Sequence, residues 1–195
     1  LDTRSFRTEL ARNPQGRPGG RGPYVPNTDT SGTILGEAQW RWLGEQLAKP
    51  ADVRVLATSI QVVADEHGWE TWGNFPHERD RLYRLIDDTN ASGLVIVSGD
   101  RHLMEISKDT SGDVPYPIVD FTSSGLNWED EPHIVDEPNT HRLGDALRQI
   151  NYGVIDIDWN DDNPTETTIT LIGRGPEGES IMRHAVSLGD LHDAE

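Results

Sequence analysis

Residues 94–102 read Leu-Val-Ile-Val-Ser-Gly-Asp-Arg-His, and this stretch decides the predicted fold. Four apolar residues in a row, three of them β-branched, predict a strand that is buried on both faces, as in a parallel sheet covered by helices. The apolar run ends at a Ser-Gly pair, and Asp100 and His102 follow it directly. Ligands of open α/β sheets bind beyond the carboxyl ends of the strands, where these two side chains are expected.

Asp100 and His102 are candidate metal ligands. A carboxylate and an imidazole one residue apart, on a turn that Gly99 can bend tightly, can reach a metal ion or a phosphate–metal cluster. A histidine ligand usually has its other ring nitrogen held by a carboxylate or a carbonyl, and Glu105 is a nearby candidate for that contact. The alternative is an Asp that caps the following turn, beside an unliganded surface His.

Helices and strands alternate around this stretch. Residues 35–47 predict an amphipathic helix, and residues 76–88 predict a second one that opens with Pro76. Residues 53–63 predict another central strand, and residues 117–122 predict a strand after the turn. The order of these elements fits right-handed βαβ units on a parallel sheet, so the fold class is α/β.

The last third of the chain has a different pattern. Residues 151–159, 166–172 and 180–188 alternate apolar with polar side chains and are separated by turn clusters, which predicts an antiparallel meander. We expect a mixed sheet that contains both the central strands and this late meander. Residues 13–33 and 127–142 predict long loops, and loops of this length are usually functional or mobile.

Composition narrows the class of protein. The chain has 195 residues, enough for one domain, and its net charge of −17 argues against nucleic acid or an anionic membrane surface as a partner. No apolar run is long enough for a membrane span. No cysteine is present, so a metal would be held by His, Asp, Glu, Asn or backbone oxygen. The acidic, lysine-poor composition also fits a salt-adapted binding module unrelated to phosphate.

Three further groups of residues are relevant to the site. Arg4 and Arg7 lie near an expected strand end and could bind a phosphate oxygen, or Arg4 could form a salt bridge to Asp2 or to a helix. Trp72 lies in an aromatic loop and either lines a pocket wall or covers the core. Six histidines without paired metal spacing are expected to face solvent: His67, His77, His133, His141, His184 and His192.

Five stretches together resemble the alkaline phosphatase D (PhoD)-like metallophosphoesterases. They are LDTRSFR at residues 1–7, ILGEAQWRWL at 34–43, WGNFPHER at 72–79, VSGDRH at 97–102 and NYGVID at 151–156. They occur in the family's order and are spread over most of the chain. The resemblance implies half of a four-layer α/β/β/α sandwich.

The resemblance also implies a reaction and a site. Members hydrolyse phosphomonoesters or phosphodiesters with a metal-activated water that attacks phosphorus in line. Asp100 and His102 fall on the family's Ser-Gly-Asp-x-His metal motif, and Arg4 is expected near the phosphate as a catalytic group. Arg101, Trp72 and Asn127 are candidate substrate-binding residues. The metals expected are iron, calcium, zinc or manganese, and secretion to the periplasm or cell surface is common in the family.

Relatives carry their first metal ligands before the Leu-Asp-Thr-Arg segment. We therefore expect residues 1–195 to form the C-terminal part of the metallophosphatase domain, completed by an N-terminal half-domain or a partner chain. An apolar surface patch would support that expectation, because such a patch needs to be covered in the native assembly. The alternative is a non-catalytic remnant or a partner-binding half-domain that lacks a complete metal site.

Overall fold

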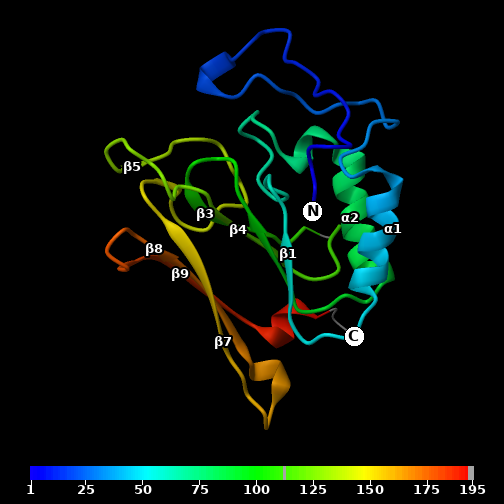
Figure 1. The fold of residues 1–195 in the computed structure, drawn as a ribbon, viewed down its shortest axis with the longest axis vertical. Coiled ribbons are helices and arrows are strands. Elements are labelled where there is room, and N and C mark those ends of the chain that lie inside the picture. The colour runs from blue at the N-terminus through cyan, green and yellow to red at the C-terminus, as the bar shows by residue number, and fades with distance from the viewer. Residues whose placement is uncertain (112, 193–195) are drawn as a thin grey trace.

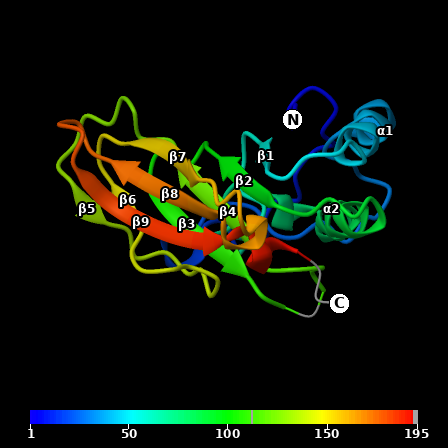
Figure 2. The same cartoon turned by 90° about the horizontal axis from the view of Figure 1, so that it is seen from below.

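The computed structural model describes residues 1–111 and 113–192, which form three layers (Figure 1, Figure 2). Helices α1 (Gly36–Leu47) and α2 (Pro76–Asp88) lie side by side on one side of a six-stranded sheet. A three-stranded sheet lies on its other side. Both helices were predicted from their apolar periodicity, and the structure confirms them.

The six-stranded sheet is mixed and has the order β1-β2-β4-β3-β6-β5. Strands β1 (Arg54–Ala57), β2 (Leu94–Ser98) and β4 (Ile118–Ser123) are parallel to one another. The antiparallel part consists of β3 (Met104–Asp109), β6 (Leu147–Arg148) and β5 (His133–Ile134). The parallel pairs β1–β2 and β2–β4 put the carboxyl ends of three strands at one edge of the sheet, where the candidate residues Asp100 and His102 follow β2.

The three-stranded sheet is the predicted meander of β7 (Tyr152–Asp158), β8 (Thr168–Arg174) and β9 (Ser180–Ser187). All its pairs are antiparallel. The expectation that it belongs to the mixed sheet is wrong, because it forms a sheet of its own. The edge of the mixed sheet beside β3 is already paired with β6, and the apolar side chains of the meander instead cover part of the face of the mixed sheet.

Short 3₁₀ helices complete the regular structure. They are η1 (Pro18–Gly20), η2 (Trp72–Asn74), η3 (Pro164–Glu166) and η4 (Leu188–Leu191).

The two faces of the mixed sheet differ in chemistry because side chains alternate along each strand. On β3 and β4 the helix side carries buried polar residues such as Glu105 and Asp120, whose neighbours in register are Thr122 and Ser107. The meander side is apolar, and its buried residues include Met104, Ile106, Val119 and Phe121. The polar face lies directly behind the carboxyl end of β2, where it can support a site.

Two predictions for the mixed sheet need correction. The strand predicted over residues 53–63 ends at Ala57, because the backbone N–H groups of Val62 and Val63 turn away to the Asp120 carboxylate, at 2.7 and 3.2 Å from Oδ2. Strand β3 was not predicted, because its sequence Met-Glu-Ile-Ser-Lys-Asp has charged residues at positions that are nevertheless buried.

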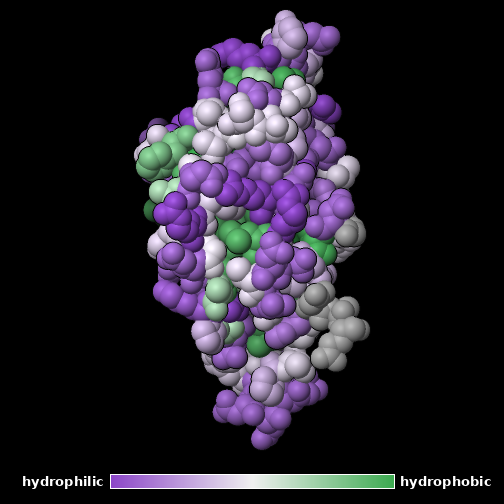
Figure 3. Space-filling model, turned by 90° about the vertical axis from the view of Figure 1, so that its right-hand side faces the viewer, coloured by the Kyte–Doolittle hydropathy of each residue, from purple (hydrophilic) through white to green (hydrophobic). Residues whose placement is uncertain are grey.

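The outer face of the helix layer is mostly hydrophilic, with only small hydrophobic areas (Figure 3). Within residues 1–111 and 113–192, we find no helix with the length and apolar character needed to cross a membrane.

Candidate metal and phosphate site

The turn after β2 presents both candidate ligands from a strained backbone. Asp100 and His102 have φ angles of +69° and +52°, which are unusual for residues with a Cβ. Both side chains are exposed at the carboxyl end of the strand. Residues held in this conformation cluster at functional sites, where the surrounding structure fixes them.

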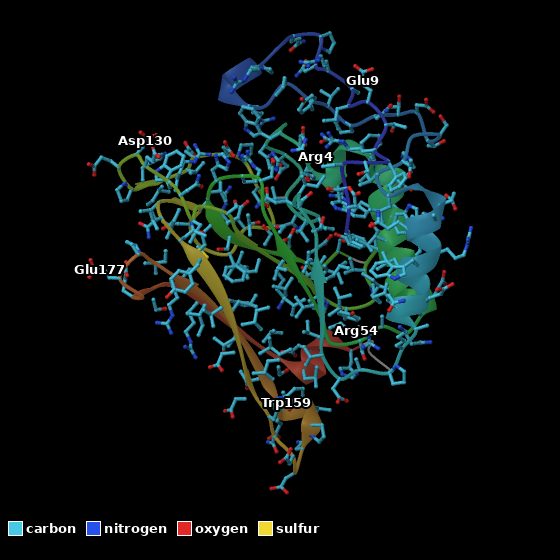
Figure 4. The ribbon with its side chains drawn as sticks, in the orientation of Figure 1. Arg4, Glu9, Arg54, Asp130, Trp159 and Glu177 are labelled. Atoms are coloured by element: carbon cyan, nitrogen blue, oxygen red, sulfur yellow. The ribbon has the colours of Figure 1, made fainter. Side chains whose placement is uncertain are left out.

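The N-terminal segment brings Arg4 to this turn. The amino group of Leu1 donates to the Ala57 carbonyl at 2.7 Å, and the hydroxyl groups of Thr3 and Ser59 share a hydrogen bond, so the segment follows the end of β1. Arg4 Nη2 lies 3.6 Å from Asp100 Oδ1. In Figure 4, Arg4 lies beyond the upper end of β1 and Arg54 lies at its lower end.

Asp2 shapes the backbone around Arg4. Its Oδ1 accepts hydrogen bonds from the N–H groups of Arg4 at 3.0 Å and Ser5 at 2.9 Å. Hydrogen bonds from Ser5, and then from Arg4, lower the pKa of the Asp2 carboxyl to about 2. The expected alternative of an Arg4–Asp2 salt bridge is thus replaced by a backbone turn that leaves the Arg4 guanidinium free to reach Asp100.

The buried carboxylate of Asp120 lies next to the turn and accepts hydrogen bonds from two segments of the chain. Ser98 donates to Asp120 Oδ1 at 2.6 Å, while the other carboxylate oxygen accepts the backbone N–H groups of Val62 and Val63. Asp120 is 1% exposed, and burial raises the pKa of its carboxyl to about 6. One carboxylate therefore ties the end of β2 to the loop after β1. Sequence reasoning missed Asp120, since a single Asp inside the strand predicted at 117–122 carries no signal of this role.

Arg101 and Trp72 do not face the open side of the turn. Arg101 is 7% exposed, forms an ion pair with Glu137, and lies with its Cζ 5.5 Å from the centroid of the Trp69 ring. Trp72 is fully buried, and its Nε1 donates to Thr58 Oγ1 at 3.1 Å. For Trp72 the structure therefore favours the alternative that it covers the core.

Asn127 and His102 lie together. Both line a cavity of about 250 Å³ whose wall also contains Trp128, Glu129 and Asp130. The structure thus places Asn127 beside one candidate ligand and Arg4 beside the other.

Two expectations are wrong, one about a contact of Glu105 and one about the exposure of His67. Glu105 does not hold His102, because its carboxylate is buried on β3 and accepts from Arg142 Nε at 2.7 Å and from Gln61. His67 does not face solvent, because the loop formed by residues 8–27 covers it and leaves it 2% exposed. Burial, with Arg101 and Arg142 adding to it, lowers the pKa of His67 to about 3.

Asp100 and His102 fit part of a metal site. Carboxylate oxygen and imidazole nitrogen suit the hard and borderline cations that a chain without cysteine can hold. Within residues 1–111 and 113–192, no group of three or more His, Cys, Asp and Glu side chains is placed to hold a metal ion. Asp100 and His102 are two candidate ligands, and such an ion requires more than two.

An apolar groove begins next to this turn. It has a volume of about 510 Å³ and runs between the mixed sheet and β7, with Val55, Val97, Phe121 and Ile155 in its wall. Its lining includes Ser98 and Gly99, the first residues of the turn. Val55 is 52% exposed because the meander covers β3 and β4 but leaves the meander-side face of β1 open.

These features define an α/β domain with a pair of candidate metal ligands and an arginine at the carboxyl ends of parallel strands. The family model described as PhoD-like phosphatase matches residues 1–149. The chain belongs to the PhoD-like phosphatase family.

Two relatives agree with this assignment. Alkaline phosphatase D of Bacillus subtilis (strain 168) is 30% identical over 111 residues, which is 52% of this chain and 18% of that protein. A solved structure titled "Structure of PhoD" superposes with a TM-score of 0.66 at 17% identity, covering 100% of this chain and 41% of that one. The structural match shows a shared fold, and this chain spans less than half of the length of either relative.

Proposed function

We propose that this chain supplies the C-terminal part of a metal-dependent phosphate-ester hydrolase, in which Asp100 and His102 bind metal and Arg4 binds the phosphate. Family membership supports hydrolysis of phosphate esters in general. The observation that carries the assignment of residues is the turn itself, which holds Asp100 and His102 in left-handed conformations with Arg4 at 3.6 Å from Asp100.

Each residue has a role that follows from its chemistry. Asp100 and His102 would hold a metal ion at the turn, and that ion would supply Lewis-acid stabilisation of the phosphoryl group and a water activated for in-line attack. Arg4 presents a planar guanidinium that can hold two phosphate oxygens and balance the charge that they carry. Asn127, beside His102, offers an amide to the ester group. Arg101 positions the turn through Glu137 and Trp69 and does not touch substrate.

The remaining ligands come, in this proposal, from an N-terminal half of the same domain that packs into the apolar groove. The groove is open over β1 and ends at Gly99, so a half-domain seated there would bring its own side chains to the edge that carries Asp100 and His102. The solved PhoD chain has more than half of its length outside the match, which is enough for such a half. Together the two parts would make the four-layer α/β/β/α sandwich.

Elemental analysis of the native protein, with every polypeptide that copurifies, tests the proposal. Asp100→Asn and His102→Gln should each weaken metal binding by on the order of a hundredfold or more, since even loss of an outer partner of a ligand costs about 10- to 100-fold. Hydrolysis of p-nitrophenyl phosphate should fall with the metal content. His192→Gln, an exposed histidine that does not line the cavity of His102 and Asn127, is the matched control and should change neither.

A second candidate function has one observation in its favour. The described residues lack a third metal ligand, as a non-catalytic half-domain that binds a partner would. Metal-free native protein without phosphatase activity, in which the three variants behave alike, would overturn the proposed function and favour this second one.

A further inference from the structure

Arg4, which contacts Asp100, also lines a further cavity that contains neither Asp100 nor His102. Its volume is about 240 Å³, and its charged and aromatic lining consists of Arg4, Arg7, Arg12, Tyr24, Glu9 and Glu70. Three guanidinium groups thus meet in one cavity, and one of them belongs to the proposed site.

The arginines differ in how far they are neutralised. Arg7 Nη1 lies 2.8 Å from Glu70 Oε2, and Arg4 Nη1 lies 3.4 Å from the same oxygen. Arg12 packs its guanidinium over the Tyr24 ring, at 5.8 Å from the centroid, and has no carboxylate within ion-pair distance among the described residues. Two carboxylates, Glu9 and Glu70, thus face three guanidinium groups in the lining, so the cavity keeps one excess positive charge.

The cavity wall is an ordered hairpin. Val25 N–H donates to the Ala11 carbonyl at 3.0 Å and Asn13 N–H donates to the Pro23 carbonyl at 2.8 Å, which places Arg12 and Tyr24 opposite each other. The hairpin packs on residues 67–68, where Gly22 and Tyr24 donate to the carbonyls of His67 and Gly68, both at 2.9 Å.

A stack of three side chains connects the hairpin to the metal-ligand turn. Arg17 lies 4.5 Å from the centroid of the Trp69 ring and Arg101 lies 5.5 Å from it. Because Arg101 lies between Asp100 and His102 in the chain, Trp69 connects the hairpin to the turn that carries both candidate ligands.

The N-terminal segment, residues 1–28, carries a net positive charge, whereas the whole chain carries a net negative charge. Residues 1–28 contain five arginines and two acidic residues, in a chain whose net charge is −17. Positive charge is thus concentrated on the segment that folds against the proposed site, where it attracts anions that the remaining surface repels.

We propose that Arg12, with Arg7 and Tyr24, forms an anion-binding subsite beside the reacting phosphate, and that the substrates are phosphate esters with a second negatively charged group on the ester. This inference rests on the proposed function and names its substrate class. Arg4 lies between the two positions, so it holds the reacting phosphate while Arg12 holds the second anion. Arg12 is a specificity residue and takes no part in the chemical step.

A pair of substrates that differ by one carboxylate tests the subsite. The ratio of kcat/KM for 4-carboxyphenyl phosphate to that for phenyl phosphate is measured with the native protein, and again with the longer 4′-carboxybiphenyl-4-yl phosphate and its uncharged analogue. Comparing the ratio between variants cancels the intrinsic reactivities of the leaving groups.

We expect Arg12→Gln to lower the ratio about fivefold or more for at least one of the two lengths, and Arg12→Glu to lower it further. High salt should reduce the wild-type preference, since the Debye length falls from about 10 Å at 0.1 M to about 3 Å at 1 M. Arg21→Gln changes an exposed arginine of the same hairpin that does not line the cavity, and it should leave the ratio unchanged.

The outcomes separate this inference from the proposed function. Hydrolysis of phenyl phosphate with the same ratios in wild type, Arg12→Gln and Arg21→Gln would overturn the subsite and leave the proposed function standing. Failure of the native protein to hydrolyse any of the four esters would overturn both.

Discussion

The Arg4 guanidinium bridges two carboxylates from different parts of the chain, with Nη2 at 3.6 Å from Asp100 Oδ1 and Nη1 at 3.4 Å from Glu70 Oε2. Its side chain is nevertheless 61% exposed, so it remains open to a substrate. The two carboxylates orient the guanidinium over the turn without burying it.

Replacement of Arg4 should therefore affect catalysis more than stability. We expect Arg4→Gln to lower kcat/KM for p-nitrophenyl phosphate by about tenfold to a hundredfold, the range for loss of a hydrogen bond to a charged group. The midpoint of thermal unfolding should stay nearly constant because the side chain is exposed. Arg41→Gln, on the exposed face of α1, is the control, and an Arg4 variant with equal activity would exclude Arg4 from the site.

Asp120 should make stability depend on pH. Its pKa is raised from 3.8 to about 6, so the folded protein binds a proton more tightly than the unfolded chain does. The free energy of unfolding should hence fall as pH rises from about 4 to 6, by on the order of 3 kcal/mol for this group alone.

Asp120→Asn is the matched variant. Its amide oxygen can accept from Val62 and Val63, its NH₂ group can donate to Ser98, and the Ser98 hydroxyl can then donate to Thr122 Oγ1, which lies 2.9 Å away. Chemical denaturation at a series of pH values measures the free energy of unfolding of wild type and variant. The difference between these two free energies should change between about pH 4 and pH 6. A constant difference would mean that Asp120 titrates as an ordinary carboxyl.

Trp72 should contribute to stability and not to substrate binding. It is fully buried, and its ring lies edge-on to that of Trp40 with centroids 6.0 Å apart. Trp72→Ala should cost about 3–5 kcal/mol in urea denaturation, whereas Trp42→Ala, at 49% exposed, should stay within about 0.5 kcal/mol. A raised KM for Trp72→Phe with unchanged stability would restore the interpretation of Trp72 as a substrate residue.

Gly22 and Gly44 should respond oppositely to alanine. A Cβ at Gly22 would overlap with the backbone carbonyl of Gly68, so Gly22→Ala should loosen the hairpin and speed hydrogen exchange at the amides of Gly22 and Tyr24. At Gly44, inside α1, a Cβ would meet only Leu85 Cδ1 at 3.4 Å. Gly44→Ala should stabilise the protein by about 0.5–1 kcal/mol. Unchanged exchange in Gly22→Ala would show that the hairpin is held elsewhere.

The sequence predicted the elements whose patterns are local. Helices α1 and α2, strands β2 and β4 and the meander each follow from periodicity and flanking turns. Strand β3 could not be predicted, because Glu105 and Asp109 look like surface residues until partners from other segments, Arg142 and Tyr83, neutralise or bind them.

In the candidate site, too, local patterns could be predicted from the sequence and contacts between distant segments could not. Asp100 and His102 are recognisable because they follow a buried strand directly. The contact between Arg4 and Asp100 joins residues 96 positions apart, and it depends on a turn made by Asp2 and on the hydrogen bond between Leu1 and Ala57. The cavity lined by Arg4, Arg7 and Arg12 depends equally on the hairpin register that places Arg12 opposite Tyr24. Such long-range placement has no signal in the local pattern of residues.

The left-handed backbone at residues 100 and 102 has a practical consequence for engineering. Glycine adopts this conformation freely, whereas a residue with a Cβ loses on the order of 1 kcal/mol there. Laboratory evolution for heat resistance alone would hence enrich glycine at both positions and discard the two candidate ligands. Libraries built on this chain need a selection for metal content or turnover beside the selection for heat resistance.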